Sequence, residues 1–259
     1  MKNILLPLYI IGIVSACSPS PESQTESNVE PPSYEYKTFK VSSEKIVKHD
    51  QGIDTAYFLS TYPEFADQQI NQFVQENLVL DSGKTSLEQM GKEFIDAYEK
   101  FYEQAEFKRS WFREETDSVV VQTPSYIGFT SFFYEYMGGA HGNYYTRYYN
   151  YDISTNKEIL LDEIIDESRL ATLITIAEGI FRKQENLEDT TSLSENYFFK
   201  DDKFALPRNF ILQKEGLLFI YSIYEIKPYV SGETKLLIPY SAIDTLLTPY
   251  GKQLLEELN

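Results

Sequence analysis

The chain has 259 residues, which is enough to bury a sizeable hydrophobic core in one large domain or in two packed domains. Its 40 acidic and 23 basic residues give a net charge of −17, which argues against nucleic acid as a partner, because that binding depends on Lys and Arg contacts with phosphates. Its single cysteine leaves no disulfide framework and no thiolate metal site.

Residues 1–16 are typical of a signal peptide. Lys2 supplies a positive charge, residues 4–14 are almost all apolar, and two small residues precede Cys17. The apolar stretch is too short to span a membrane. The pattern resembles a bacterial lipobox, in which Cys17 would be lipidated and would anchor the chain as a lipoprotein of the cell envelope, at the outer membrane or the cell surface. The alternative is an ordinary secreted protein with an unmodified cysteine.

Residues 17–33 are predicted to form a flexible tether that begins at the lipidated cysteine, because Pro, Ser and Glu dominate and apolar residues are almost absent. Removal of residues 1–16 takes away one Lys and no acidic residue, so the mature chain has 22 basic and 40 acidic residues and a net charge of −18. This charge suits a basic partner, or simply keeps the protein soluble. Most of the 21 Tyr and 17 Phe are expected in the core, although tyrosine also supplies contact energy at binding surfaces.

The first part of the folded chain predicts strands and two helices. Alternating polar and apolar residues predict strands over residues 34–48, 53–62, 111–122, 125–137 and 143–152, the last three antiparallel in succession. Apolar residues at helical spacing predict one helix that Pro63 opens and Asp81-Ser82-Gly83 ends, and a second helix over residues 86–105.

The second part of the chain predicts helices first and then strands. Helices are expected over residues 167–183 with Asp166 as N-cap, over 241–247 with Ser241 as N-cap, and from Thr248 onward. Strands are expected over residues 204–213, 217–224 and 235–240, with a short strand at 159–161 and a polar, partly helical stretch at 186–203. This order favours an α+β fold, with helices packed on a largely antiparallel sheet and two closely packed subdomains.

Several motifs in the second half of the chain resemble one family. They are Gly138-Gly139-Ala140-His141, Lys157 to Glu163, Phe204, Gly216 to Phe219, Tyr224-Glu225-Ile226, Pro228-Tyr229 and Ile238-Pro239-Tyr240. Together they resemble the C-terminal domain of the anti-sigma-V factor RsiV, which is shared with the non-catalytic region of the peptidoglycan deacetylase PdaC. The resemblance divides the folded chain into a PdaC-like N-terminal domain, residues 34–137, and an RsiV-like C-terminal domain, residues 138–259.

The resemblance implies binding and not catalysis. The RsiV ectodomain is a lysozyme receptor, whereas the deacetylase domain of PdaC and the sigma-binding part of RsiV have no counterpart in this sequence. We therefore expect a non-catalytic module, without a cofactor, that binds a lysozyme-like or other basic protein. Two alternatives stay open, a module that binds peptidoglycan or another cell-wall glycan, and an envelope hydrolase with an unrecognised site.

Six residues are candidate ligand contacts, namely Gly138, Gly139, His141, Tyr144, Tyr145 and Tyr148. With only two histidines in the chain, an imidazole metal site is not expected. The structural alternative for His141 is that its ring bonds backbone groups at the crossing between two strands, where the glycines adopt unusual dihedral angles. The three tyrosines fall on both faces of one strand, so that one face can be core and the other an aromatic platform for a protein or a sugar.

Overall fold

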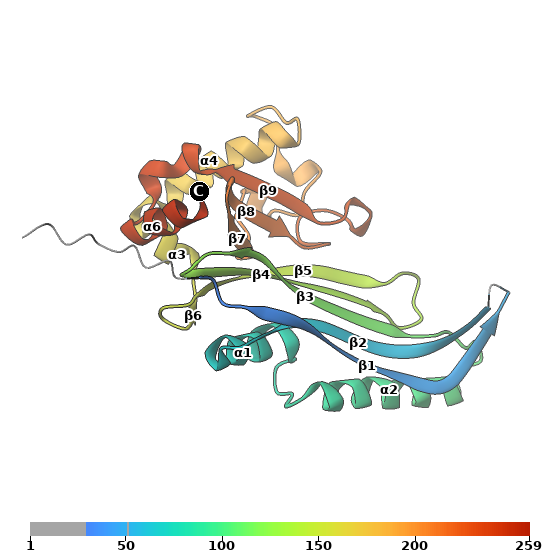
Figure 1. The fold of residues 1–259 in the computed structure, drawn as a ribbon. Helices are drawn as coiled ribbons and strands as arrows, with labels where there is room; N and C mark the ends of the chain where they lie inside the picture. The colour runs from blue at the N-terminus through green and yellow to red at the C-terminus, as the bar shows by residue number, and fades with distance from the viewer. Residues whose placement is uncertain (1–29, 51) are drawn as a thin grey trace, which may run out of the picture.

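The computed structural model describes residues 30–50 and 52–259 (Figure 1). The predicted signal peptide, the predicted lipidation site Cys17 and most of the predicted tether lie outside the described residues. Within the described part of the chain, no helix combines the length and the apolar character that a membrane span requires.

A six-stranded sheet forms the centre of the molecule, and its strands lie side by side in the order β1 to β6. Their bounds are β1 (Tyr34–His49), β2 (Gly52–Phe65), β3 (Phe112–Gln122), β4 (Tyr126–Tyr136), β5 (Asn143–Asp152) and β6 (Lys157–Glu158). Every neighbouring pair is antiparallel except β2 and β3, which run parallel because the chain passes through two helices between them. The predicted α+β fold with a largely antiparallel sheet is confirmed.

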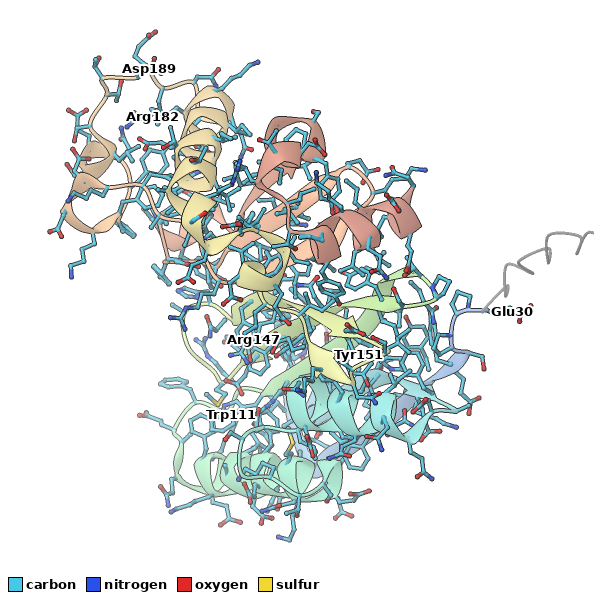
Figure 2. All side chains as sticks on the ribbon, turned by 90° about the vertical axis from the view of Figure 1, so that its left-hand side faces the viewer. Glu30, Trp111, Arg147, Tyr151, Arg182 and Asp189 are labelled. Atoms are coloured by element: carbon cyan, nitrogen blue, oxygen red, sulfur yellow. The ribbon has the colours of Figure 1, made fainter. Side chains whose placement is uncertain are left out.

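Two helices cover one face of this sheet (Figure 1). They are α1 (Gln68–Val74), which continues into a π-helical turn (Gln75–Val79), and α2 (Leu87–Gln104). The core between helices and sheet is aromatic, and Figure 2 shows Tyr151 between the sheet and α1, where its ring lies 4.6 Å from that of Phe73.

The prediction that Pro63 opens the first helix was wrong. Pro63 lies in β2 opposite Tyr36, and pairing with β1 continues as far as Phe65. The helix begins only after Asp67, whose carboxylate accepts a hydrogen bond from the backbone N–H of Gln69.

A second unit packs on the opposite face of the large sheet (Figure 1). Its antiparallel sheet consists of β7 (Phe210–Gln213), β8 (Gly216–Tyr221) and β9 (Thr234–Pro239). Its helices are α3 (Leu161–Ile164), α4 (Leu170–Gln184), α5 (Tyr240–Ile243) and α6 (Pro249–Leu258). Short 3-10 turns occupy Glu167–Arg169, Leu193–Glu195, Lys200–Asp202, Tyr229–Ser231 and Asp244–Leu246.

Several boundaries in the second unit differ from the sequence prediction. The short strand predicted at 159–161 was wrong, because β6 ends at Glu158 and α3 begins at Leu161. The strand predicted over 204–213 begins at Phe210, and the one predicted over 217–224 ends at Tyr221, since Tyr224 adopts a left-handed φ of 63° that no strand accepts. Ser241 is not an N-cap, because α5 already begins at Tyr240. Asp166 does act as a cap, and its carboxylate accepts a hydrogen bond from the Ser168 backbone N–H.

Asparagine side chains join the two units. Asn150 is 2% exposed, and it donates to the carbonyl of Phe210 and accepts from the N–H of Leu212 at 2.9 and 3.1 Å. Asn209 bonds the free backbone edge of β5 in the same way, at the N–H of Tyr148 and the carbonyl of Thr146. The second unit therefore covers the edge of β5 that β6 leaves unpaired.

The connection between β4 and β5 contains the domain boundary predicted at 137/138. Both strands belong to the large sheet, so β5 and β6 complete a sheet that the preceding segment begins. Successive residues of β4 point to opposite faces of the sheet and so pack in two different cores. Tyr126 packs in the core of the second unit, and Ile127 packs in the core between the sheet and the helices α1 and α2.

Candidate functional site

The turn between β4 and β5 is held against the second unit. The His141 ring stacks on that of Tyr229 at 4.0 Å, and His141 Nδ1 donates to the carbonyl of Gly142 at 2.8 Å. The Tyr229 hydroxyl donates to the same carbonyl at 2.8 Å. Gly138 adopts a left-handed φ of 82°, whereas Gly139 lies outside that region. These contacts fit the structural alternative for His141.

Gly142→Ala is expected to destabilise the fold by about 1–3 kcal/mol. A Cβ at Gly142 would stand 2.4 Å from a ring carbon of Tyr134, so the ring or the turn would have to move. The measurement is the free energy of unfolding in urea. Gly139→Ala is the matched control, because its Cβ would meet nothing closer than 3.8 Å. Equal stability of the two variants would contradict this expectation.

The three candidate tyrosines of β5 do not share a surface. Tyr144 and Tyr148 lie on the face that carries the second unit, and Tyr145 lies on the face that carries the helices. Tyr148 lines a pocket of about 600 Å³ whose other walls are mostly apolar. The six candidate residues therefore fall into four places: Gly138, Gly139 and His141 lie in the turn, Tyr144 lies among other aromatic rings, and Tyr145 and Tyr148 line two different pockets.

We call the exposed aromatic surface next to the second unit the aromatic face. It consists of two groups of contacting rings, Tyr57, Phe112, Tyr134 and Tyr136 in one and Phe132, Tyr144, Tyr224 and Tyr229 in the other. Within each group, the centroids of neighbouring rings are 5.1 to 6.3 Å apart. The strand members point away from the helices, on the part of the sheet that the second unit leaves open (Figure 1). Phe132 and Tyr224 are 39% and 56% exposed.

Two tyrosines of the aromatic face have raised pKa values. Burial, followed by a hydrogen bond to Glu114 at 2.5 Å, raises the pKa of Tyr57 to about 12. Burial and the nearby Glu233 raise the pKa of Tyr144 as well. Neutral phenols with fixed rings can contact a partner through both an apolar body and a polar tip.

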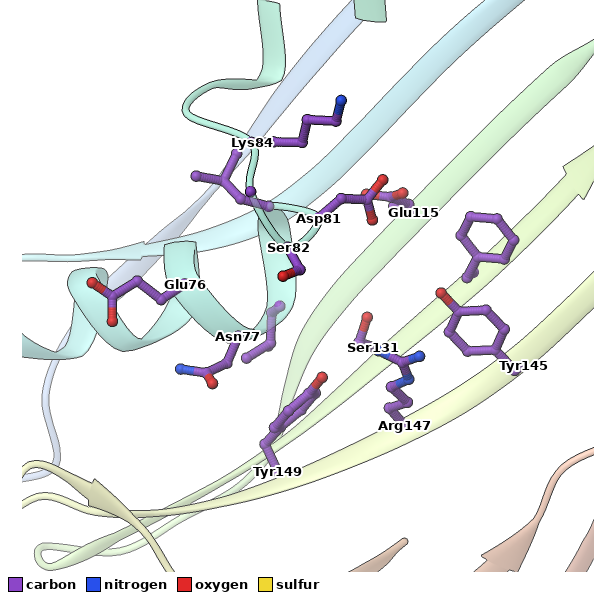
Figure 3. Close-up of a pocket in the computed structure, with 14 residues that line it drawn as sticks. Glu76, Asn77, Asp81, Ser82, Lys84, Glu115, Ser131, Tyr145, Arg147 and Tyr149 are labelled. Atoms are coloured by element: carbon purple, nitrogen blue, oxygen red, sulfur yellow. The ribbon is translucent and has the colours of Figure 1, made fainter. Parts of the chain in front are cut away.

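A second candidate site lies on the other face of the sheet (Figure 3), and we call it the polar pocket. It has a volume of about 440 Å³. The sheet side is lined by Glu115, Ser131, Phe133, Tyr145, Arg147 and Tyr149, and the roof by chain segment 76–84 except Val79. The Arg147 guanidinium lies 4.7 Å from the ring centre of Tyr145, which stacks on Phe133 at 4.7 Å.

Buried charges stand beside the polar pocket. Arg113 bonds Glu115 and, at 2.8 Å, Asp81, while burial raises the pKa of Glu115 against the lowering effect of Arg113. Asp117, on the same sheet face, is fully buried, and neither of its oxygens has a hydrogen-bond partner. Burial is the larger effect on Asp117 and raises its pKa to about 7. The Ser131 hydroxyl lies nearby and has a smaller, lowering effect on this pKa, but it does not form a hydrogen bond with Asp117.

Sequence reasoning missed most of this pocket. Of its lining residues only Tyr145 was a candidate, because the others come from three strands and a loop that are far apart in the chain. Glu115 and Asp117, two residues apart in a predicted strand, were the available signal, since such spacing puts both carboxylates on one face. Among residues 30–50 and 52–259, no group of three or more His, Cys, Asp or Glu side chains is arranged to hold a metal ion.

Two family models match successive parts of the chain. The model described as "Deacetylase PdaC" matches residues 53–144, from β2 into β5, and the one described as "Protein of unknown function (DUF3298)" matches residues 157–241, from β6 into α5. The chain thus contains a PdaC segment followed by a DUF3298 segment, and the predicted PdaC-type segment is confirmed. The finer likeness to RsiV stays a prediction.

Solved structures and curated relatives are similar to the chain over different lengths. A DUF3298 family protein from Bacteroides fragilis has a TM-score of 0.69 at 18% identity, covering 88% of this chain and 98% of its own. One from Pseudomonas aeruginosa has a TM-score of 0.68 at 18% identity, covering 86% and 97%. These two structures share the fold.

The immunogenic proteins MPB64 of Mycobacterium bovis and MPT64 of Mycobacterium tuberculosis are each 27% identical over 116 residues, which is 44% of this chain. The matched part is 49% of each relative, so the chain spans about half the length of the curated relatives it matches.

Proposed function

We propose that this chain is a non-catalytic binding module of the cell envelope, anchored by a lipid on Cys17, that captures a basic protein of the lysozyme type. The aromatic face is the observation that carries the proposal. Its eight rings are fixed by neighbouring strands and by one another, so little side-chain entropy remains to be lost on binding. Tyrosine and other aromatic residues supply much of the energy at protein interfaces.

The charge of the chain supports a basic partner. The net charge of −17 attracts cations over a distance, and Glu114, Glu225 and Glu233 stand next to members of the aromatic face. Such attraction speeds encounter between oppositely charged proteins and weakens with salt. Lysozyme-type binding is also what the resemblance of the sequence to RsiV implies.

The two histidines bear on the hydrolase alternative. His141 stacks on Tyr229 and bonds the neighbouring backbone, and His49 lies 3.0 Å from the carboxylate of Asp54 near the tip of the β1–β2 hairpin. Each imidazole thus has a partner where it stands. His49 also lines a pocket of about 470 Å³ together with Asp54, so an imidazole base is available to the hydrolase alternative.

The double variant Phe132→Ala/Tyr224→Ala is expected to bind lysozyme roughly tenfold or more weakly than the natural chain, because two exposed rings of the aromatic face are removed. Calorimetry at low and at moderate salt is the measurement, and the affinity of the natural chain should fall between the two. Leu160→Ala is the matched control, since Leu160 is 53% exposed in the second unit and lies outside the aromatic face.

Four results would decide against the proposal in different ways. If no complex with lysozyme forms at either salt concentration, the lysozyme-type partner is wrong. Retention on purified cell wall at high salt would establish the glycan-binding alternative. Turnover of a cell-wall substrate, lost in a variant of a pocket residue, would establish the hydrolase. An unacylated Cys17 in the native host, seen by mass spectrometry, would remove the anchor.

A further inference from the structure

The polar pocket contains charged groups of both signs, with Arg147 and Glu115 on the sheet side and Asp81 and Lys84 on the segment that covers it. Figure 3 shows Arg147 between Tyr145 and Tyr149 on the sheet side, facing the loop that carries Asp81 and Ser82. Within the described chain, Arg147 forms no salt bridge with a carboxylate. The guanidinium of Arg147 interacts instead with the hydroxyl of Tyr149 and, at longer range, with the carboxylate of Asp81.

The guanidinium of Arg147 is held in place before any ligand arrives. It lies over the ring of Tyr145, whose other side stacks on Phe133 with an interplanar angle of 10°. Phe133 in turn stacks on Arg113, at 5.0 Å from its guanidinium carbon. A planar cation fixed on an aromatic ring keeps its N–H groups free for a carboxylate.

Two carboxylates of the pocket have an oxygen available, Asp81 on the segment that covers the sheet and Glu115 on the sheet itself. Arg113 bonds one oxygen of Asp81 and one oxygen of Glu115, and the second oxygen of each makes no hydrogen bond within the described residues. Buried on the same sheet face, Asp117 and Ser60 have no hydrogen-bond partner at all among those residues. Neither Asp117 nor Ser60 lines the pocket, so the carboxylate oxygens within reach of a ligand are those of Asp81 and Glu115.

We propose that the polar pocket binds a small zwitterion, an amino acid or a short peptide with free ends. The ligand carboxylate accepts from Arg147, with the phenols of Tyr145 and Tyr149 beside it, and the ligand ammonium donates to the carboxylates of Asp81 and Glu115. A volume of about 440 Å³ is in the range of small-molecule sites. A zwitterion also carries no net charge, so the negative field of the whole chain does not repel it.

This inference is independent of the proposed function. The polar pocket and the aromatic face lie on opposite faces of the large sheet, so a protein can be captured whether or not the pocket is occupied. Variants of one site leave the residues of the other unchanged. The failure of either proposal is therefore distinguishable from the failure of the other.

Alanyl-alanine is the probe that tests the pocket, together with its N-acetylated form and its C-terminal amide. In calorimetry and NMR titration of the full chain, we expect the free dipeptide to bind about tenfold or more tightly than either blocked form, because each block removes a charge-assisted contact. In the variant Arg147→Gln, the free dipeptide and its amide should bind equally weakly. In the variant Arg147→Lys, part of the preference for the free carboxylate should return.

Arg208→Gln is the matched control, because Arg208 is an exposed arginine outside the polar pocket. It should leave both affinity and end-group preference unchanged. The proposal is overturned if the free dipeptide does not bind at millimolar concentration, if the blocked forms bind equally well, or if Arg147→Gln keeps the preference for the free carboxylate. Circular dichroism of each variant separates loss of binding from loss of folding.

Discussion

As pH rises from about 4 to 7, the natural chain is expected to lose stability, and the variant Asp117→Asn is expected to remove most of that loss. Burial raises the pKa of Asp117 to about 7 in the folded chain, from an ordinary value of 3.8. Between these values the folded state keeps a proton that the unfolded state has released. Stability therefore falls as pH rises through this window, and above about pH 7 both states are ionised and the loss is complete.

The expected difference is roughly 4–5 kcal/mol in the free energy of unfolding, because each pKa unit corresponds to about 1.4 kcal/mol. Asparagine resembles the protonated acid and carries no charge at any of these pH values. Urea unfolding of both chains from pH 4 to pH 8 is the measurement. The difference between the two stability curves should grow with pH and become constant above about pH 7.

Asp166→Asn supplies the control of opposite sign. Asp166 is an exposed cap whose pKa is lowered, first by the side-chain hydrogen bond from Ser168. Its stabilising effect is present above the ordinary pKa of aspartate and disappears as pH falls, so this variant should lose stability at neutral pH and not in acid. Parallel stability curves for Asp117→Asn and the natural chain would show that Asp117 is hydrated or paired in solution.

The sequence predicts the large sheet well because its signal is local. Residues 111–152 alternate with a period of two, and the turns between their strands contain Pro, Ser and Gly, so β3, β4 and β5 lie close to their predicted places. The apolar stripe of α2 is an equally local sequence signal, because its buried residues Met90, Phe94 and Tyr98 recur at helical spacing. Such patterns depend only on which face of an element meets the core.

The sites could not be predicted in the same way, because they depend on register and on pairing between distant segments. Phe132 and Tyr144 meet only because Phe132 and Thr146 are opposite each other in the β4–β5 pair. Arg147 meets the roof of the polar pocket only through the packing of the 76–84 segment on the sheet. A tyrosine-rich strand indicates aromatic surface but does not say which ring faces which site.

The start of the first helix shows a different limit of prediction from sequence. Pro63 carries a strong helix-start signal, yet it lies in β2, where pairing with β1 outweighs the local preference. The aligned residues of β1 are about thirty positions earlier in the chain, outside any local window. Tertiary pairing of this kind moves boundaries without changing the fold class.

Asn150→Ala is expected to lower the free energy of unfolding by roughly 3–5 kcal/mol, because it leaves several buried polar groups without partners. The side chain accepts from the Tyr126 hydroxyl at 2.8 Å and from the Leu212 N–H, and it donates to the Phe210 carbonyl. Phe210 and Leu212 lie on the edge of β7 that faces the large sheet, where no other strand is available to bond them. Asn77→Ala is the control, since Asn77 bonds a carbonyl of α1 at the exposed surface.

Asn150→Ala should also uncouple the two units, because its side chain holds β7 onto β5. The single tryptophan, Trp111, packs in the core beneath the sheet and reports on that unit, whereas far-ultraviolet circular dichroism reports on the whole chain. In the natural chain the two signals should change together in urea, as in a cooperative transition. In Asn150→Ala the circular dichroism should begin to change first, because the second unit loses its anchor. Coincident transitions in the variant, or a loss of stability no larger than that of Asn77→Ala, would mean that apolar packing alone joins the units.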